Sequence, residues 1–276
     1  MPATNAIDDL FRRLRLSREK AFIPFLAAGD PDIASTAKLI RELDSLGSHL
    51  IEIGFPFSDP IADGPVIQAS YSRALDRGLK LDDVFHCVEE VKLKASPVAA
   101  PIIGMASYSL IFRKGQNAFL DRAIGAGFSG VIVPDLPVEE AGPLAKLAAA
   151  KDFRLILLVT PTTPPKRAER IVKLSTGFVY CVSVAGITGE RDRLPDELLE
   201  QLRRLRTITD LPLCVGFGIS KPAHVQMLRE IADGIIVGSA IVRRLEGVRP
   251  EGLDQAIGQI RELVRGLQRA LNPSKE

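Results

Sequence analysis

Short, almost continuously apolar runs recur along the chain. Eight of them occupy residues 21–29, 50–54, 100–106, 130–137, 154–161, 178–184, 212–220 and 234–242, and they are rich in Ile, Val and Leu. Runs of this length without polar alternation are typical of strands that are buried on both faces, as in a parallel sheet. The pattern therefore predicts eight parallel strands.

Amphipathic segments of helical length separate these runs. The segment 35–47 places leucines on one stripe and ends at Gly47, a residue type that favours helix C-termini. The other expected helices are 196–209, 222–234, about 5–15 before the first strand and 251–271 after the last. Doubly wound sheets usually have fewer strands, so the alternation favours a closed α/β barrel of the (β/α)8 or TIM type with an extra N-terminal helix.

Length and composition agree with one such barrel. The chain has 276 residues, of which 46% are hydrophobic and 25% are charged, and no linker or low-complexity stretch divides it. We therefore expect a single domain over residues 1–276, with the barrel proper at about 18–270. The formal net charge of +2 gives no indication of nucleic acid or of an anionic membrane as a partner.

The cysteines and histidines are scattered. Cys87, Cys181 and Cys214 form no C-x-x-C pair, so we expect neither a metal site nor a disulfide framework. The first 14 residues carry charges where a signal peptide needs an apolar run, and no apolar segment approaches the roughly 18 residues of a membrane span. These features favour a cytoplasmic location.

The run at 50–54 carries a carboxylate, Glu52, two residues before its end. In a (β/α)8 barrel the catalytic groups lie at the carboxyl ends of the strands. A glutamate in a buried strand is costly unless it is paired or protonated, and an ion pair with a neighbouring strand is one interpretation. No neighbouring run has an inward cation near its end, so we favour a functional acid whose pKa is raised by apolar surroundings.

A proline-rich loop, FPFSDPIADGP at 55–65, follows this strand. Its three prolines lower the entropic cost of ordering it. Asp59 and Asp63 both have the alternative explanation of ordinary turn residues. Asp63 is followed by Gly64, and its closeness to Glu52 favours a second functional acid at this position.

Glycine-rich segments after the last two strands predict a phosphate site. These are GFGIS at 216–220 and GSAIV at 238–242, which opens a helix. Backbone N–H groups at these loops of a barrel commonly hold phosphate, although either motif alone is also explained by a turn. Gly216, Gly218 and Gly238 permit close approach of the backbone, and Ser239 offers a hydroxyl. A further loop at 185–191 suits a lid that brings Thr188 and Gly189 to the site.

Three aromatic side chains complete the predicted pocket. Tyr180 is either a core residue or a site residue, and its hydroxyl needs a partner in both cases. Phe25 and Phe217 are expected as pocket walls. Apolar walls, two acids and a phosphate cradle predict a site for a hydrophobic or aromatic phosphate ester, with proton chemistry that needs no metal.

Six segments together resemble the tryptophan synthase alpha subunit family. They are PFLAAGDPD (24–32), LIEIGFPFSDPIADGPVIQ (50–68), VPDLPVEE (133–140), SVAGITG (183–189), GFGIS and GSAIV, in order from about residue 20 to 245. The resemblance implies retro-aldol cleavage of indole-3-glycerol phosphate to indole and glyceraldehyde 3-phosphate. It also implies an alpha-beta-beta-alpha heterotetramer, in which indole passes through a tunnel to the beta subunit for L-tryptophan synthesis. The resemblance implies no cofactor in this chain, since pyridoxal phosphate is expected only in the beta subunit.

The resemblance also implies a role for each site residue. Glu52 matches the general acid/base that protonates indole C3, and Asp63 matches the acid that holds the indole N–H. Tyr180 matches a site tyrosine, and Thr188 a lid residue that packs against Asp63. The phosphate ligands would be Gly189, Gly218, Gly238 and Ser239, and the indole pocket would be lined by Phe25, Phe217 and Ile236.

Three positions depart from the family pattern. Ser107 and Ser109 stand where members often have tyrosine and asparagine, and Val184 stands where some have arginine. Two alternatives to a bifunctional complex therefore stay open. One is a stand-alone lyase that releases free indole. The other is a non-catalytic scaffold that activates the beta subunit, against which the intact Glu52 and Asp63 argue.

Overall fold

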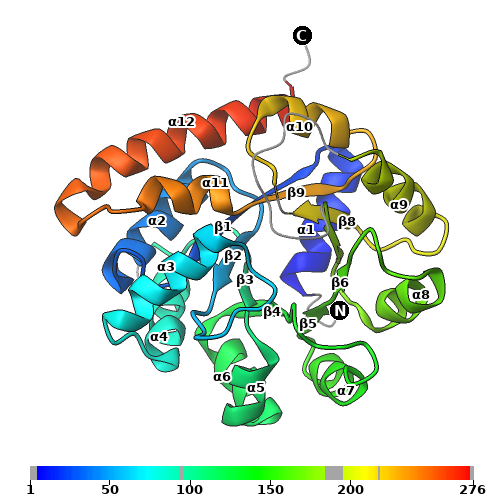
Figure 1. Cartoon of the computed structure of the whole chain (residues 1–276), viewed down its shortest axis with the longest axis horizontal. Coiled ribbons are helices and arrows are strands. Elements are labelled where there is room, and N and C mark those ends of the chain that lie inside the picture. The colour runs from blue at the N-terminus through cyan, green and yellow to red at the C-terminus, as the bar shows by residue number, and fades with distance from the viewer. Residues whose placement is uncertain (1–4, 94–95, 184–194, 217, 274–276) are drawn as a thin grey trace.

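The computed structural model describes residues 5–93, 96–183, 195–216 and 218–273. Within them, parallel strands form one sheet in the order β5-β4-β3-β2-β1-β9-β8-β7-β6. Their bounds are β1 Ala21–Ala27, β2 Ile51–Gly54, β3 Ile102–Met105, β4 Phe128–Ile132, β5 Arg154–Ile156, β6 Leu158–Val159, β7 Val179–Val182, β8 Leu213–Gly216 and β9 Gly234–Val237. Figure 1 shows the strands gathered at the centre, with helices around them.

The predicted run at 154–161 forms two strands, because its pairing partner changes within it. β5 pairs with β4, and β6 pairs with β7. Between them, the Leu157 carbonyl accepts a hydrogen bond from the Tyr180 N–H at 3.3 Å. The chain itself thus continues from one edge of the ladder to the other, and the sheet closes into the predicted (β/α)8 barrel.

Helices follow the strands in turn. They are α1 Ala6–Ser17, α2 Ile33–Ser45, α3 Pro65–Asp76, α4 Leu81–Leu93, α5 Tyr108–Lys114, α6 Gln116–Ala126, α7 Gly142–Ala150, α8 Pro165–Leu174, α9 Asp196–Arg206, α10 Pro222–Leu228, α11 Ser239–Val242 and α12 Leu253–Leu271, with short 3-10 turns at Arg243–Leu245 and Pro250–Gly252. The helix predicted over 222–234 ends early, at Leu228. The Asp233 N–H donates to the Leu213 carbonyl at 2.8 Å instead, which starts β9 beside β8.

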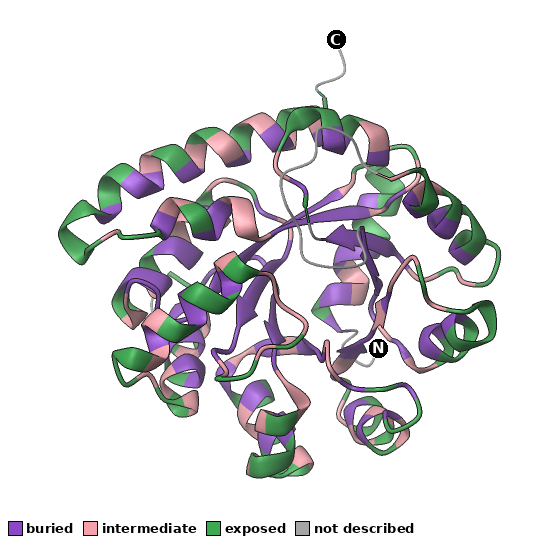
Figure 2. Ribbon diagram, viewed as in Figure 1, coloured by how far each residue is buried: buried purple, intermediate pink, exposed green. Residues whose placement is uncertain are grey.

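Alternation along the strands separates two hydrophobic clusters. On β1, Phe22 and Leu26 pack toward the helices, whereas Ile23 and Phe25 belong to the cluster inside the barrel. Figure 2 shows the strands as almost uniformly buried. Leu50, two residues before Glu52, also belongs to the inner cluster, so Glu52 points into the barrel.

The N-terminal helix α1 is anchored at the end of the barrel where the strands begin. The Asn5 amide donates to the carbonyls of Ser129 and Asp152 at 3.0 and 2.7 Å. The rings of Phe11 and Phe178 have their centroids 5.8 Å apart. With α1 packed at this end, the site is left to the loops that follow the strands. No helix among the described residues is long and apolar enough to cross a membrane.

Candidate active site

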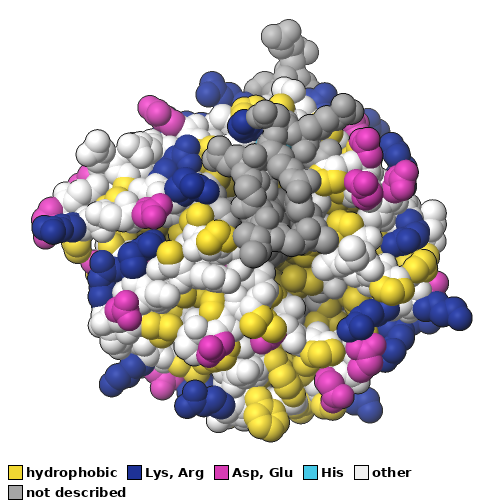
Figure 3. All heavy atoms as spheres, viewed as in Figure 1, with side chains coloured by type: hydrophobic (Ala, Val, Ile, Leu, Met, Phe, Trp, Pro, Cys, Tyr) yellow, Lys and Arg dark blue, Asp and Glu magenta, His cyan; other side chains and the backbone are white. Residues whose placement is uncertain are grey.

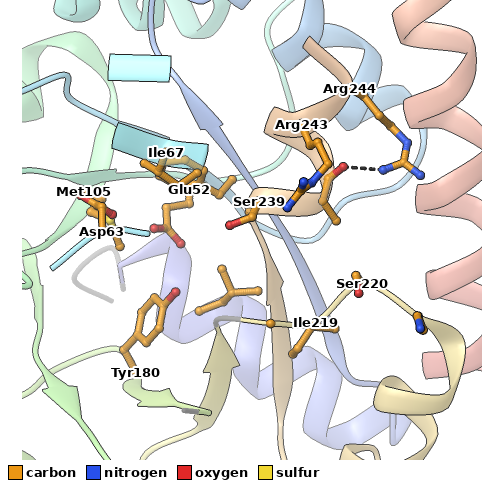
Figure 4. Close-up of a pocket in the computed structure, with 16 residues that line it drawn as sticks. Glu52, Asp63, Ile67, Met105, Tyr180, Ile219, Ser220, Ser239, Arg243 and Arg244 are labelled. Carbon is orange, nitrogen blue, oxygen red and sulfur yellow. Dashed lines mark hydrogen bonds between the residues drawn. The ribbon is translucent and has the colours of Figure 1, made fainter. Parts of the chain in front are cut away.

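A cavity of about 190 Å³ lies at the carboxyl ends of the strands (Figure 4). Its lining includes eight predicted site residues: Phe25, Glu52, Asp63, Tyr180, Gly218, Ile236, Gly238 and Ser239. Eight further residues line it without having been predicted: Ile67, Met105, Ile219, Ser220, Lys221, Ala240, Arg243 and Arg244. The other predicted site residues, Thr188, Gly189 and Phe217, lie outside the described residues, as does Val184.

Glu52 is completely buried on β2, between Phe25 on β1 and Ile103 on β3. Neither of its carboxyl oxygens has a hydrogen-bond partner among the described residues. Burial, and then the nearby charge of Asp63, raise the pKa of Glu52 well above its usual value. The ion-pair interpretation is therefore wrong for the described part of the chain, and Glu52 is set up to carry a proton at neutral pH.

Asp63 reaches the same cavity from the loop between β2 and α3. Its N–H donates to the Pro60 carbonyl at 3.1 Å, and its carbonyl accepts from the Gln68 amide at 2.8 Å. Burial, and then the charge of Asp135, raise the pKa of Asp63 to about 7. By contrast Asp59 is exposed and accepts a hydrogen bond from the Ser58 hydroxyl at 2.6 Å. The structure thus places Asp63 at the cavity, as predicted, and Asp59 outside it.

Tyr180 projects from β7 toward Glu52 in Figure 4. A Cβ at Gly216 would lie 2.1 Å from its hydroxyl oxygen, so only glycine fits beside it. This corrects the interpretation of Gly216 as part of a phosphate cradle, because its missing side chain makes room for Tyr180. Burial, and then Glu52, raise the pKa of Tyr180, which keeps its hydroxyl protonated.

One end of the cavity is glycine-rich and basic. Gly218 has a φ of +72°, which favours glycine, and Gly238 caps α11, whose first residue is Ser239. N–H groups in the first turn of a helix lack acceptors within the helix. The Ile241 and Val242 N–H groups donate to the Gly238 carbonyl at 2.8 and 3.1 Å, which leaves those of Ser239 and Ala240 for a ligand. Arg243 lies next to Ser239, and Arg244 donates to the Ala240 carbonyl (Figure 4). This end has the chemistry of an anion site.

Arg243 and Arg244 were not predicted from the sequence, because a net charge of +2 does not show where the positive charges lie. Both directly follow the GSAIV motif, and this position was the signal that could have identified them.

The rest of the cavity wall is apolar. Phe25 and Ile236 were predicted for it, and Ile67 and Met105 extend it. Ile67 lies in the first turn of α3. Its role was not predicted, because the proline-rich loop directly before it obscures the start of this helix in the sequence. An apolar chamber with two acids and a basic end fits an aromatic phosphate ester. Groups of three or more His, Cys, Asp or Glu arranged for a metal ion are absent from the described residues.

Ser107, one of the departures from the family pattern, has a local structural role. Its hydroxyl donates to Asp135 at 2.6 Å and accepts from the Ser109 N–H at 3.2 Å, which caps α5. Asp135 also accepts from the Tyr108 N–H at 2.8 Å. The serine at 107 therefore holds Asp135 close to Asp63.

Comparisons with known proteins find relatives over most of the chain. The family model described as tryptophan synthase alpha chain matches residues 11–272. The tryptophan synthase alpha chain of Rippkaea orientalis is 50% identical over 255 residues, which cover 92% of this chain and 94% of that protein.

Solved structures have the same fold. The tryptophan synthase subunit alpha from Legionella pneumophila is 32% identical with a TM-score of 0.86, covering 98% of this chain and 99% of that one. A chain of the tryptophan synthase complex from Pyrococcus furiosus is 38% identical with a TM-score of 0.81, covering 90% and 98%.

Proposed function

The chain belongs to the tryptophan synthase alpha chain family, and on that premise we propose that its cavity binds indole-3-glycerol phosphate. The chain is a carbon–carbon lyase that cleaves this substrate to indole and glyceraldehyde 3-phosphate. The residues that carry the reaction are assigned below from their positions in the cavity.

Glu52 acts as the general acid and base. Its carboxyl group, neutral in the buried site, gives its proton to indole C3, which leaves a positive charge on the ring nitrogen. The resulting carboxylate then takes the proton of the glycerol hydroxyl next to the ring. The carbon–carbon bond breaks, its electron pair returns to the ring, and an aldehyde forms. The proton balance closes, because Glu52 ends as it began.

Asp63 acts as the electrostatic partner of this step. Its carboxylate accepts the indole N–H and stabilises the positive charge that develops on the ring after protonation. This role requires an ionised Asp63 and a protonated Glu52 in the same cavity. Two neighbouring acids favour this combination of one ionised and one protonated carboxyl group, because the charge on one opposes ionisation of the other. Tyr180, on the opposite wall, is proposed to orient the glycerol chain.

The glycine-rich, basic end takes the phosphate. The proposed donors are the N–H groups of Ser239 and Ala240, the hydroxyl of Ser239 and the guanidinium of Arg243, and Gly218 also lines the cavity. Phe25, Ile236, Ile67 and Met105 then hold the indole ring at the apolar end. Thr188, Gly189 and Phe217 are proposed to complete the site from outside the described residues.

A beta subunit is the proposed partner, at the face onto which the cavity opens. A second groove of about 700 Å³ lies there, lined in part by Ile61, Asp63, Leu136 and Val138. Figure 3 shows this face, where hydrophobic side chains lie among the charged ones toward α5. Pyridoxal phosphate is assigned to the partner alone, with no cofactor in this chain, and the location proposed is the cytoplasm.

The observation that carries the proposal is Glu52, a fully buried carboxyl group without a hydrogen-bond partner among the described residues and beside a second acid. The test is a steady-state assay with indole-3-glycerol phosphate, in which indole and glyceraldehyde 3-phosphate are quantified together. Equal molar amounts of the two products from the wild-type chain are expected, and their absence at high enzyme concentration would overturn the proposal.

A further inference from the structure

Tyr71 on α3 is a group near the catalytic acids that the sequence did not predict. Its side chain is 2% exposed and belongs to the cluster inside the barrel. A Cβ at Gly54 would lie 2.3 Å from its hydroxyl oxygen. Gly54 is two residues after Glu52 and on the same side of β2. The Tyr71 hydroxyl therefore enters the mouth of the barrel, although it faces no solvent.

A small cavity connects Tyr71 with Asp63. It has a volume of about 20 Å³ and is lined by both residues, by Ser107 and Asp135, and by apolar groups that include Phe55 and Met105. To hold one water molecule, a cavity needs about 10–15 Å³ of space that the centre of a water molecule can occupy, and two to four polar partners for that water. This cavity meets both requirements, because the hydroxyls of Tyr71 and Ser107 and the carboxylates of Asp63, Asp135 and Asp59 line it.

Within the described ranges, the charged groups near Asp63 are all acids, and neither carboxyl oxygen of Glu52 makes a hydrogen bond there. Glu52 faces it from β2, Asp135 from the segment after β4, and Asp59 lies on its own loop, and all three are acids. Asp135 already accepts from Ser107 and from the Tyr108 N–H. Tyr180 faces the same acids from β7.

Tyr71 remains a donor in this environment. Burial, followed by the charges of Asp63 and Glu52, raises the pKa of Tyr71 well above its usual value, so its hydroxyl keeps its proton at neutral pH. Without a donor, burial and Asp135 hold the pKa of Asp63 at about 7, which leaves much of it protonated at neutral pH. A protonated Asp63 cannot stabilise a cationic ring.

We propose that Tyr71 is a positioning residue that donates a hydrogen bond to the Asp63 carboxylate through one water molecule in this small cavity, and so keeps Asp63 ionised. This rests on the role of Asp63 under the proposed function. A hydrogen bond to the charged form of an acid lowers its pKa, because it stabilises the ionised state alone. A ring that served only as packing would have no such effect.

The test is Tyr71→Phe, which keeps the ring and removes only the hydroxyl. We expect the pKa of Asp63, followed by ¹³C NMR of its labelled carboxyl group, to rise by about one unit. The acid limb of kcat/KM should move upward by the same amount, with turnover restored at high pH. An Asp63 pKa that is the same in the variant and the wild type would overturn the proposal.

The matched control is Tyr108→Phe. The Tyr108 hydroxyl accepts from the Gln116 amide at 2.8 Å and does not line the small cavity, so this variant should leave the Asp63 pKa unchanged. An equal shift in both variants would point to a general effect of losing a hydroxyl and would also overturn the proposal. The NMR titration needs no activity, so a chain without lyase activity would refute the proposed function while still testing Tyr71.

Discussion

Phe25 and Glu52 occupy directly paired positions on β1 and β2. The aromatic wall of the cavity and its buried acid are therefore fixed by a single strand register. A shift of one residue in β2 would turn Glu52 toward the surrounding helices and bring Ile53 inside, since side chains alternate along a strand.

Glu52→Gln should lower turnover by roughly 10²–10⁴-fold, because the amide keeps the shape but cannot move a proton. The variant should fold, since a neutral group replaces a neutral group. The measurement is the steady-state rate of indole formation, with thermal denaturation as the check on folding. Glu200→Gln, on the exposed face of α9, is the control with the same substitution and should be fully active. Near-normal turnover of Glu52→Gln would refute the proton transfer.

Asp63→Asn should reduce turnover strongly, whereas Asp59→Asn should leave the turnover of the isolated chain nearly unchanged. Asp63 lines the cavity, and Asp59 is exposed and bonded to Ser58. The asparagine at 63 loses the charge that stabilises the developing cation. The two variants are compared under saturating substrate. Greater damage from Asp59→Asn would show that the two acids have been assigned the wrong way round.

The contribution of Asp63 to the stability of the chain should decrease as pH rises from 3.8, the ordinary pKa of this carboxyl group, to its folded pKa, which burial raises. In that window the folded chain holds a proton that the unfolded chain has released, so raising the pH favours unfolding. Asp63→Asn cannot release a proton. Its stability relative to the wild type should therefore increase across the window, as measured by urea unfolding at pH 4, 5.5 and 8. A pH-independent difference would contradict the raised pKa.

Gly218→Val should raise the KM for the substrate steeply, because Gly218 combines a φ of +72° with a position on the cavity wall. Gly238→Val should do the same by narrowing the cavity, since a Cβ there already meets the Phe25 ring at 3.5 Å. Ser239→Ala, which removes one donor of several, should weaken binding by about 1–2 kcal/mol.

These variants are tested by calorimetry with the substrate and with its analogue lacking the phosphate. Equal affinity of the wild type for both ligands would remove the phosphate site. Arg243→Gln should weaken binding of the substrate but not of the analogue that lacks the phosphate. The matched control is Arg265→Gln, at an exposed arginine on α12, which should change neither affinity.

Adding a saturating beta subunit should raise turnover at least tenfold, since a partner over the open face would favour a closed, preorganised site. Phe112→Glu should weaken this activation without changing the intrinsic rate. Phe112 is 68% exposed on α5, the helix that directly follows the carboxyl end of β3. Leu16→Glu is the control, because Leu16 is 81% exposed on α1 at the opposite end of the barrel. A beta subunit that binds yet leaves turnover unchanged would instead favour a stand-alone lyase.

The sequence by itself determined the barrel and most of the cavity's chemistry. Short unbroken apolar runs are typical of strands in a parallel sheet covered on both faces, and a carboxylate such as Glu52 within one is costly unless it is paired or protonated. The glycines and Ser239 also stood out, because their positions after the last two strands point to one end of a barrel.

Only the tertiary structure decided which groups surround the two acids. Gly54 had no role predicted from the sequence and Gly216 was predicted for the phosphate cradle, but each makes room for a tyrosine hydroxyl, from α3 and from β7 respectively. No local pattern in the sequence assigned a role to Tyr71 or to Asp135. The position of Tyr71 depends on how α3 packs against the end of β2, and Asp135 reaches the same small cavity from a segment that is distant from Asp63 in the sequence. Neither arrangement leaves a local pattern by which to find it.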